Sequence, residues 1–102
     1  MRMGEVQQRE LFKLIADDYV ARILSATYDG PLTIQQISYR CGIPIAMAYR
    51  RVAQLEENGL LKCAKEEEGR RGRRLKYFSC AVRSVNLSFH DGAFSLHIDP
   101  LR

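Results

Sequence analysis

Between Pro44 and Lys76 the chain reads PIAMAYRRVAQLEENGLLKCAKEEEGRRGRRLK, and this segment sets the architecture. Its first half places apolar residues one and two helical turns apart, at Ala48, Val52 and Leu55. Asn58-Gly59 then supplies a helix end, because both residues tolerate a left-handed backbone. Two strand-like runs, 60–66 and 75–82, enclose a loop with four arginines and two permissive glycines. The segment predicts a helix over 44–58 followed at once by a β-hairpin with a cationic tip.

Two further helices are expected upstream. Residues 5–15 carry the helical stripe Leu11, Leu14 and Ile15. A second helix begins at Asp17 or Asp18, since a short carboxylate accepts the free N–H groups of a first turn, and it ends at Asp29-Gly30-Pro31.

A short third helix starts at Thr33, where Thr33 and Gln36 have the spacing of a capping box. Gly42 ends this helix, and Ile43-Pro44 opens the next one. Two helices joined by a short glycine turn form a helix-turn-helix unit.

The positive charge of the chain is localised. From Arg50 to Lys76 there are nine Lys or Arg and five Asp or Glu, whereas the remaining residues hold seven of each. A concentrated cationic patch favours a polyanionic partner such as nucleic acid over a merely solvated charge run.

A helix beside a cationic loop suits duplex DNA, because the major groove admits one α-helix. We expect Tyr49 and Arg50 to reach base edges or flanking phosphates, with Ala46 and Ala53 allowing close approach. Tyr49 as a packing residue is the competing interpretation. At the edges of the helix, Arg51 and Gln54 are expected to contact phosphates.

The loop arginines have a separate predicted role. Arg70, Arg71, Arg73 and Arg74 suit a narrow minor groove and phosphates, and they would supply affinity and salt dependence. Glu66, Glu67 and Glu68 oppose them, and would either neutralise part of the loop or keep it in register when DNA is absent. The helix that starts at Thr33 is expected to aim free N–H groups at a phosphate.

The last segment predicts a second hairpin. Asp91-Gly92 is a two-residue turn signal. Counting outward from it pairs Phe89 with Phe94, Leu87 with Leu96 and Val85 with Ile98, so every apolar pair falls on one face. Such a face cannot stand alone in water, and it must cover the domain or meet a second chain.

The composition limits the remaining functions. The chain has 102 residues, 46% of them hydrophobic and 27% charged, as expected for one soluble domain. No run of about 20 apolar residues and no secretory signal is visible, so a cytoplasmic location without a membrane partner is expected. Cys41, Cys63 and Cys80 show no metal-binding spacing and no disulfide framework.

No enzymatic role is predicted. The sequence has no nucleophile-and-base order and no phosphate-binding glycine loop. His90 and His97 fall four positions apart along the predicted ladder, too far to share one ion. We therefore expect no catalytic residue, metal, cofactor or small-molecule ligand.

Residues 18–82 resemble prokaryotic winged helix-turn-helix transcriptional regulators of the broad ArsR and MarR type. The resemblance rests on motifs spread over that range: Ile23-Leu24, DGPLTI at 29–34, CGIP at 41–44, YRRV at 49–52, LEENGLL at 55–61 and the basic loop. It implies a homodimer that reads a pseudo-palindromic operator, with recognition helix 44–58 and wing 66–75. The positions that match the cysteines of metal-sensing members are Thr33 and Gln35, and the usual C-terminal helix is replaced by a hairpin.

The expected fold class is α+β, a winged helix-turn-helix with three to four helices, a β-wing and an additional C-terminal β-hairpin. Residues 1–16 form an N-terminal helix and possible dimer contact, residues 17–82 the DNA-binding domain, and residues 83–102 the hairpin, as a core cover or dimer interface. The lead hypothesis is a sequence-specific DNA-binding transcriptional regulator. A winged-helix protein-interaction module and a structured-RNA-binding protein are the alternatives.

Overall fold

The computed structural model describes residues 5–101, with side chains from Gln8 onward. The elements in order are α1 (Glu5–Ile15), α2 (Asp18–Tyr28), α3 (Ile34–Cys41), α4 (Ile45–Glu57), β1 (Leu61–Glu68), the 3-10 turn η1 (Arg70–Gly72), β2 (Arg74–Cys80), β3 (Val82–His90) and β4 (Ala93–Pro100). The predicted α+β class, with a winged helix-turn-helix and an extra hairpin, is confirmed. Residues 1–4 and 102 of the predicted terminal segments lie outside the described residues.

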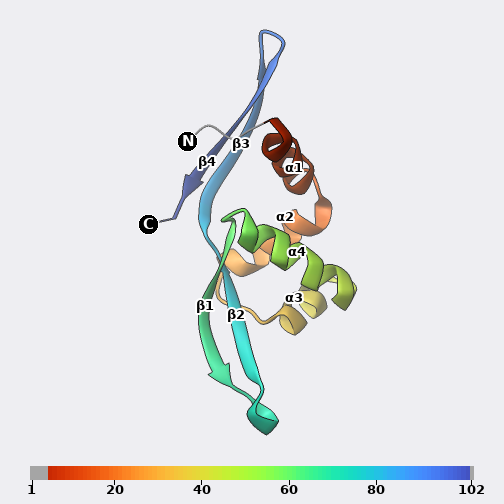
Figure 1. Ribbon diagram of the computed structural model, residues 1–102, viewed down its shortest axis with the longest axis vertical. Helices are drawn as coiled ribbons and strands as arrows, with labels where there is room; N and C mark the ends of the chain where they lie inside the picture. Colours follow the sequence, from red (N-terminus) through yellow and green to blue (C-terminus); the bar gives the residue numbers. More distant parts are fainter. Residues whose placement is uncertain (1–4, 102) are drawn as a thin grey trace.

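The four helices gather along one side of a long ribbon that the two hairpins form (Figure 1). The β1–β2 hairpin runs toward one end of the molecule and the β3–β4 hairpin toward the other. The molecule is consequently elongated, with extents of 56 × 28 × 24 Å.

The core lies between the helices and the base of the β1–β2 hairpin. Helical residues at the expected spacing are fully buried, among them Ile23, Ile37 and Leu55. Leu60 and Leu61 close the core where the chain leaves α4. Burial of each such side chain stabilises the fold by about 1.5–3 kcal/mol.

The ends of the helices follow the sequence signals. Asp17 caps α2, and Thr33 and Gln36 form the predicted capping box of α3. At the end of α4 only Gly59 adopts the left-handed backbone, with φ of 76°, while Asn58 has a φ of −93°.

The register of the C-terminal hairpin is the predicted one. Phe89 pairs with Phe94, and the ladder continues to Val85 opposite Ile98. Asp91 and Gly92 both have positive φ, as a two-residue hairpin turn requires.

The predicted strand 75–82 was wrong at its end. β2 stops at Cys80, and Val82 already belongs to β3. Ala81 leaves both ladders because its N–H donates to the Leu60 carbonyl and its carbonyl accepts from the Leu101 N–H. This residue therefore joins the two hairpins.

Candidate nucleic-acid interface

The turn between α3 and α4 is held by local hydrogen bonds. Gly42 ends α3 with a φ of 64°, which permits the reversal of the chain. The Ile43 N–H donates to the Ser38 carbonyl at 3.0 Å, and the Ser38 hydroxyl donates back to the Ile43 carbonyl. These bonds fix the orientation of α4 relative to α3.

The outer face of α4 is open to solvent. Ala48, Val52 and Leu55 are buried on the inner side. Ala46, Arg50 and Ala53, which fall on the opposite side of a helix of this period, are exposed. Arg50 makes no ion pair within the described chain. The face combines small residues with one unengaged guanidinium group.

Tyr49 connects this face to the wing. Tyr49 is 55% exposed, so it is not part of the buried core. It lines a groove of about 300 Å³ that also includes residues from α3 and from β2. The remaining lining residues are Thr33, Ile34, Gln35, Arg73, Arg74, Leu75, Lys76 and Phe78.

A single β-bridge positions the wing beside the start of α3. Leu32 and Phe78 exchange both backbone hydrogen bonds, at 2.9 and 2.8 Å. Because Thr33 follows Leu32 directly, the first turn of α3 is held against β2. The bridge therefore brings α3, α4 and the wing into one concave surface.

The tip of the wing carries exposed arginines on a tight turn. Arg70, Arg71 and Arg73 are exposed, and none makes an ion pair with a described residue. Arg71 has a φ of 59°, a left-handed backbone that costs a non-glycine residue about 1 kcal/mol. Gly72 continues the turn with a φ of 72°. The turn therefore leaves three exposed guanidinium groups at the tip of the wing.

Ion pairs neutralise the stem of the wing. Arg74 lies 3.0 Å from Glu66, and Lys65 lies 2.9 Å from Glu67. The hydrogen bond to Glu67 raises the pKa of Lys65, and the same contact lowers the pKa of Glu67. The glutamates thus neutralise cations on the strands at the stem of the wing, while the arginines at the tip keep their charge.

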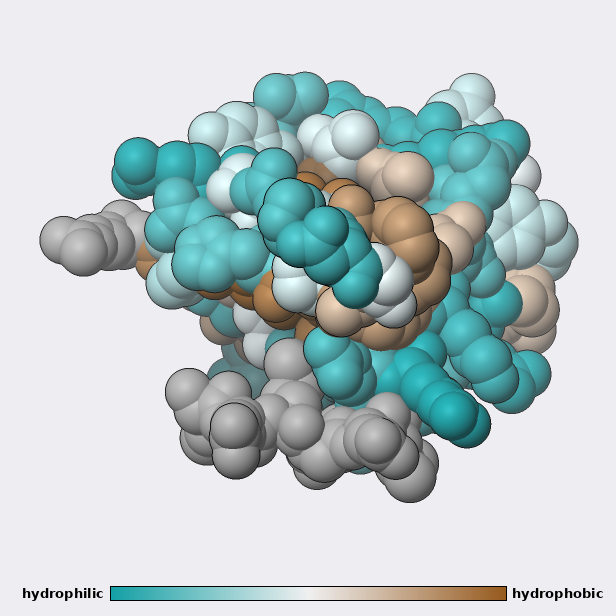
Figure 2. All heavy atoms as spheres, turned by 90° about the horizontal axis from the view of Figure 1, so that it is seen from above, coloured by the Kyte–Doolittle hydropathy of each residue, from teal (hydrophilic) through white to brown (hydrophobic). Residues whose placement is uncertain are grey.

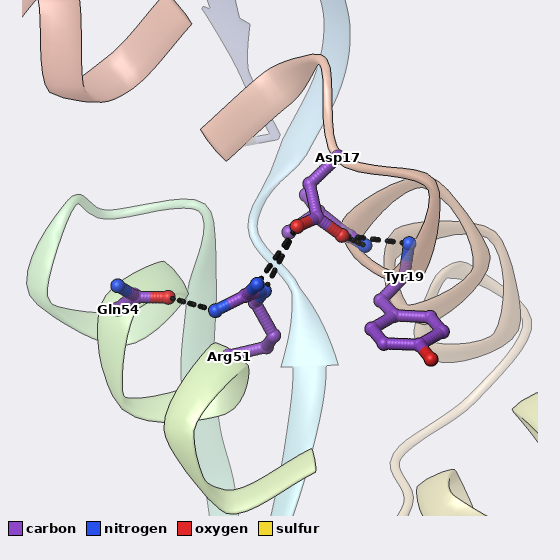
Figure 3. Close-up of polar contacts among 5 residues, drawn as sticks. Asp17, Tyr19, Arg51 and Gln54 are labelled. Carbon is purple, nitrogen blue, oxygen red and sulfur yellow. Dashed lines mark hydrogen bonds and ion pairs between the residues drawn. The ribbon is translucent and has the colours of Figure 1, made fainter. Parts of the chain in front are cut away.

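Arg51 and Gln54 lie on the other flank of α4 and are engaged inside the protein (Figure 3). The Arg51 guanidinium contacts Asp17 Oδ2 at 2.9 and 3.0 Å and donates to Gln54 Oε1 at 3.1 Å. These contacts face the α1–α2 junction, and the phosphate contacts expected of both residues stay predictions. A contact between residues 17 and 51 depends on tertiary packing, which helical spacing does not reveal.

Two polar residues of the groove were missed as site residues. Lys76 and Gln35 both line the groove. Lys76 follows the arginines on β2 and was counted only in the charge balance. The signal that would have included Lys76 is its position at the start of the predicted strand that follows the loop.

The described chain offers little for other chemistry. No group of three or more His, Cys, Asp or Glu residues gathers as metal ligands among residues 5–101. All three cysteines are free thiols, and burial raises the pKa of Cys41. Within the described residues, no helix has the length and apolar character needed to cross a membrane.

Comparisons with known proteins support the helix-turn-helix fold. Residues 15–64 match a family model described as a helix-turn-helix domain. No curated protein matches the chain in sequence.

Two solved structures are similar in fold. One is the homodimeric winged helix-turn-helix DNA-binding domain of a possible ArsR-family transcriptional regulator from Mycobacterium bovis, with 19% identity and a TM-score of 0.59; the match covers 74% of this chain and 64% of that one. The other is NolR from Sinorhizobium fredii, with 9% identity, a TM-score of 0.55, and coverage of 78% and 80%. The predicted winged helix-turn-helix fold is confirmed. With β1–β2 as its wing, the chain is a winged helix-turn-helix protein whose helix-turn-helix domain lies within residues 15–64.

Proposed function

We propose that this protein is a DNA-binding transcriptional regulator that places α4 in the major groove and the wing on the minor groove and its phosphates. The observation that carries the proposal is the shared groove: Tyr49 of α4 and the 73–76 segment of the wing line one cavity beside the start of α3. A helix and a cationic loop arranged around one concavity match the two grooves of a duplex.

Arg50 is the proposed base-reading residue. Its exposed guanidinium has no ion pair in the described chain and stands beside Ala46 and Ala53, which have no bulk to hold the helix away. A bidentate contact from arginine to guanine contributes about 1–3 kcal/mol of discrimination. The Tyr49 hydroxyl would reach a flanking phosphate or base edge from the groove side.

The wing would supply affinity. Arg70, Arg71 and Arg73 are exposed and unengaged by described carboxylates, whereas Arg74 must leave Glu66 before it binds a phosphate. Each phosphate contact makes the slope of log K against log salt steeper by about 0.9. Lys76 on β2 adds one more cation inside the groove.

The first turn of α3 is a proposed phosphate contact. The Thr33 side chain already accepts from the Gln36 N–H at 3.1 Å. The neighbouring backbone N–H groups at the helix start remain directed along the helix axis, where an anion is favoured. Thr33 would thus act as a cap with the phosphate held by the backbone beside it.

The proposed partners are double-stranded DNA and a second copy of the chain, in the cytoplasm, without a cofactor or small-molecule ligand. The fold similarity to a homodimeric domain is consistent with pairing. Structured RNA is the less favoured nucleic acid, because the deep and narrow major groove of A-form RNA excludes a helix. A purely protein-binding role would not explain the exposed Arg50 and the exposed arginines at the wing tip.

A fluorescence anisotropy titration over a salt series tests the proposal, with duplex DNA and duplex RNA of one sequence as competitors. We expect DNA to compete better than RNA, and Arg70→Gln to reduce the slope by about 0.9. Arg83→Gln, an exposed arginine on β3 outside the groove, is the matched control and should leave the slope unchanged. Absence of DNA binding at low salt would end the proposal.

A further inference from the structure

Gln54 lies beside the proposed base-reading residue on α4. It follows Arg50 by four positions and Arg51 by three, so its side chain is a neighbour of both on the surface of the helix. Gln54 is half-buried, and it lines a cavity of about 170 Å³ between α4 and the α1–α2 junction. Its amide therefore lies at the edge of the proposed reading face, within reach of solvent.

The surface around Gln54 is mainly polar. The other residues that line the cavity are Glu10, Lys13, Leu14, Asp17 and Arg51. Hydrophobic side chains gather instead at the end of the molecule away from the wing, seen in Figure 2, where Phe89 and Phe94 of the β3–β4 hairpin are exposed. Hydrogen bonding thus decides what Gln54 can contact.

Arg51 determines which way the amide of Gln54 is turned. Arg51 Nη1 donates to Gln54 Oε1 at 3.1 Å. The guanidinium group has donors only, so the atom that faces it must be the amide oxygen. The amide nitrogen of Gln54 consequently lies on the side away from Arg51 (Figure 3). Among the described residues, no acceptor is bonded to that nitrogen.

Arg51 is itself held by Asp17. Its Nε and Nη2 atoms both contact Asp17 Oδ2, at 3.0 and 2.9 Å. The other carboxylate oxygen accepts from the Tyr19 and Val20 N–H groups at the start of α2, which fixes the orientation of Asp17. Asp17, Arg51 and Gln54 thus form one hydrogen-bonded chain from the cap of α2 to the edge of the reading face. We call these three residues the relay.

The relay restricts what Gln54 can recognise. A glutamine that is free to turn reads adenine with both ends of its amide, donating to N7 and accepting from N6. Here the oxygen is turned inward to Arg51, so only the nitrogen is available outward. We propose that the relay makes Gln54 a donor-only reader of a base pair close to the one read by Arg50. Such a group prefers the acceptor edges of guanine and thymine.

This inference rests on the proposed function, because it states what a second residue of α4 recognises in the same major groove. Asp17 and Arg51 are positioning residues in it, and neither needs to touch DNA. A phosphate oxygen is an acceptor as well. A base edge is favoured because Gln54 follows the exposed Arg50 by one helical turn, which keeps it beside the residue that enters the groove.

Substitution of single base pairs in the preferred duplex tests the reading role. The site is selected from a random pool with the parent chain, and Kd is then measured by anisotropy for each altered duplex. At one pair near the Arg50 guanine, loss of the acceptor, as in 7-deazaguanine, should weaken the parent about three- to tenfold, the effect of one hydrogen bond. Gln54→Ala should bind all versions of that pair within about twofold. Asn86→Ala removes an exposed amide from β3 and should keep the parental preference.

Inversion of the hydrogen-bonding group gives a readout that a loss of stability does not mimic. Gln54→Glu keeps one oxygen for Arg51 and presents the other outward, so the outer group becomes an acceptor. The preferred base at that pair should switch to cytosine, whose N4 group donates. Arg51→Gln releases the amide of Gln54, and this variant should accept adenine at that pair. Both variants should retain the preference for the Arg50 guanine, and thermal melts verify that they fold.

Side-chain relaxation measured by NMR tests the relay in the free chain. The Gln54 amide group should be ordered in the parent, and its order parameter should fall below about 0.6 in Arg51→Gln. Gln36 is the internal control, because its oxygen also accepts a hydrogen bond, from the Thr33 N–H at 2.9 Å. Its amide group should be equally ordered in both chains. A Gln54 amide that is already mobile in the parent would overturn the relay.

The outcomes separate this inference from the proposed function. If the chain binds duplex DNA and Gln54→Ala keeps the parental base preference, the reading role of Gln54 is rejected while the proposed function stands. An effect of Gln54→Ala that depends on one phosphate, and disappears when a methylphosphonate replaces it, would also reject base reading. Absence of DNA binding at low salt would reject both.

Discussion

Arg51 of α4 and Asp17 at the start of α2 form a partly buried ion pair, with 2.9 Å between Nη2 and Oδ2. The other oxygen of Asp17 accepts from the Tyr19 N–H at 2.8 Å and the Val20 N–H at 3.3 Å. One carboxylate therefore caps α2 and holds the proposed recognition helix at the same time. The side chains are only 18% and 24% exposed, so solvent screens the pair less than a surface bridge.

A double-mutant cycle measures the interaction energy between Asp17 and Arg51. Asp17→Asn keeps a capping side chain but removes the charge, and Arg51→Gln removes the other partner. We expect a coupling of about 1 kcal/mol in the free energy of unfolding, from urea denaturation of the two single variants and the double variant. Asp17→Ala should cost about 0.5–2 kcal/mol more than Asp17→Asn, because the cap is lost as well. A coupling of zero would mean that the pair contributes nothing.

Replacement of Arg50 should change which DNA sequences are preferred. Selection from a random duplex pool gives the preferred site of the parent chain, and Arg50→Gln should lose about 1–3 kcal/mol of discrimination at one guanine. Its affinity for random duplex should fall much less, through the loss of one cation. Arg83→Gln should retain the parental preference, and an unchanged preference for Arg50→Gln would remove that residue from base reading.

Release of Arg74 from its intramolecular partner should strengthen DNA binding. Glu66→Gln removes the carboxylate that lies 3.0 Å from Arg74 Nε, so the guanidinium becomes available for a phosphate. We expect higher affinity at low salt and a slope steeper by about 0.9 in an anisotropy titration. Asp29→Asn makes the same change in net charge at the end of α2, and it should leave the slope as it was. Equal slopes for both variants would show that Arg74 does not reach DNA.

The three thiols should react at different rates. Cys41 is buried and its pKa is raised by burial, so at pH 8 less of it is thiolate, the reactive form. Cys80 is buried, while Cys63 is half-exposed on β1. Alkylation of the folded chain followed by mass spectrometry should label Cys63 first, and unfolding in urea should equalise the rates. Early labelling of Cys41 would contradict the burial described above.

Local signals explain most of what the sequence predicted correctly. The register of β3–β4 followed from Asp91-Gly92, because a two-residue turn determines every later pair and the alternation of Phe89 and Phe94 with polar residues agreed with it. The cap at Thr33 likewise involves neighbours only. Within the proposed site, the spacing of α4 correctly placed Ala46 and Arg50 on the open face.

The errors arose where distant segments meet. Nothing near Arg51 in the sequence indicates Asp17, so the ion pair between them was not predicted. The end of β2 was misplaced because Ala81 bonds to Leu60 and Leu101 rather than to a ladder neighbour. The left-handed backbone of Arg71 went unpredicted as well, since glycine is the residue expected in that conformation.

The junction at Ala81 couples the two hairpins. Its N–H is bonded to the chain leaving α4, at Leu60, and its carbonyl to the end of the second hairpin, at Leu101. Because β2 ends at Cys80 and β3 begins at Val82, this one residue separates the wing from the second hairpin. Any change in its backbone conformation would therefore turn the wing and the second hairpin relative to each other.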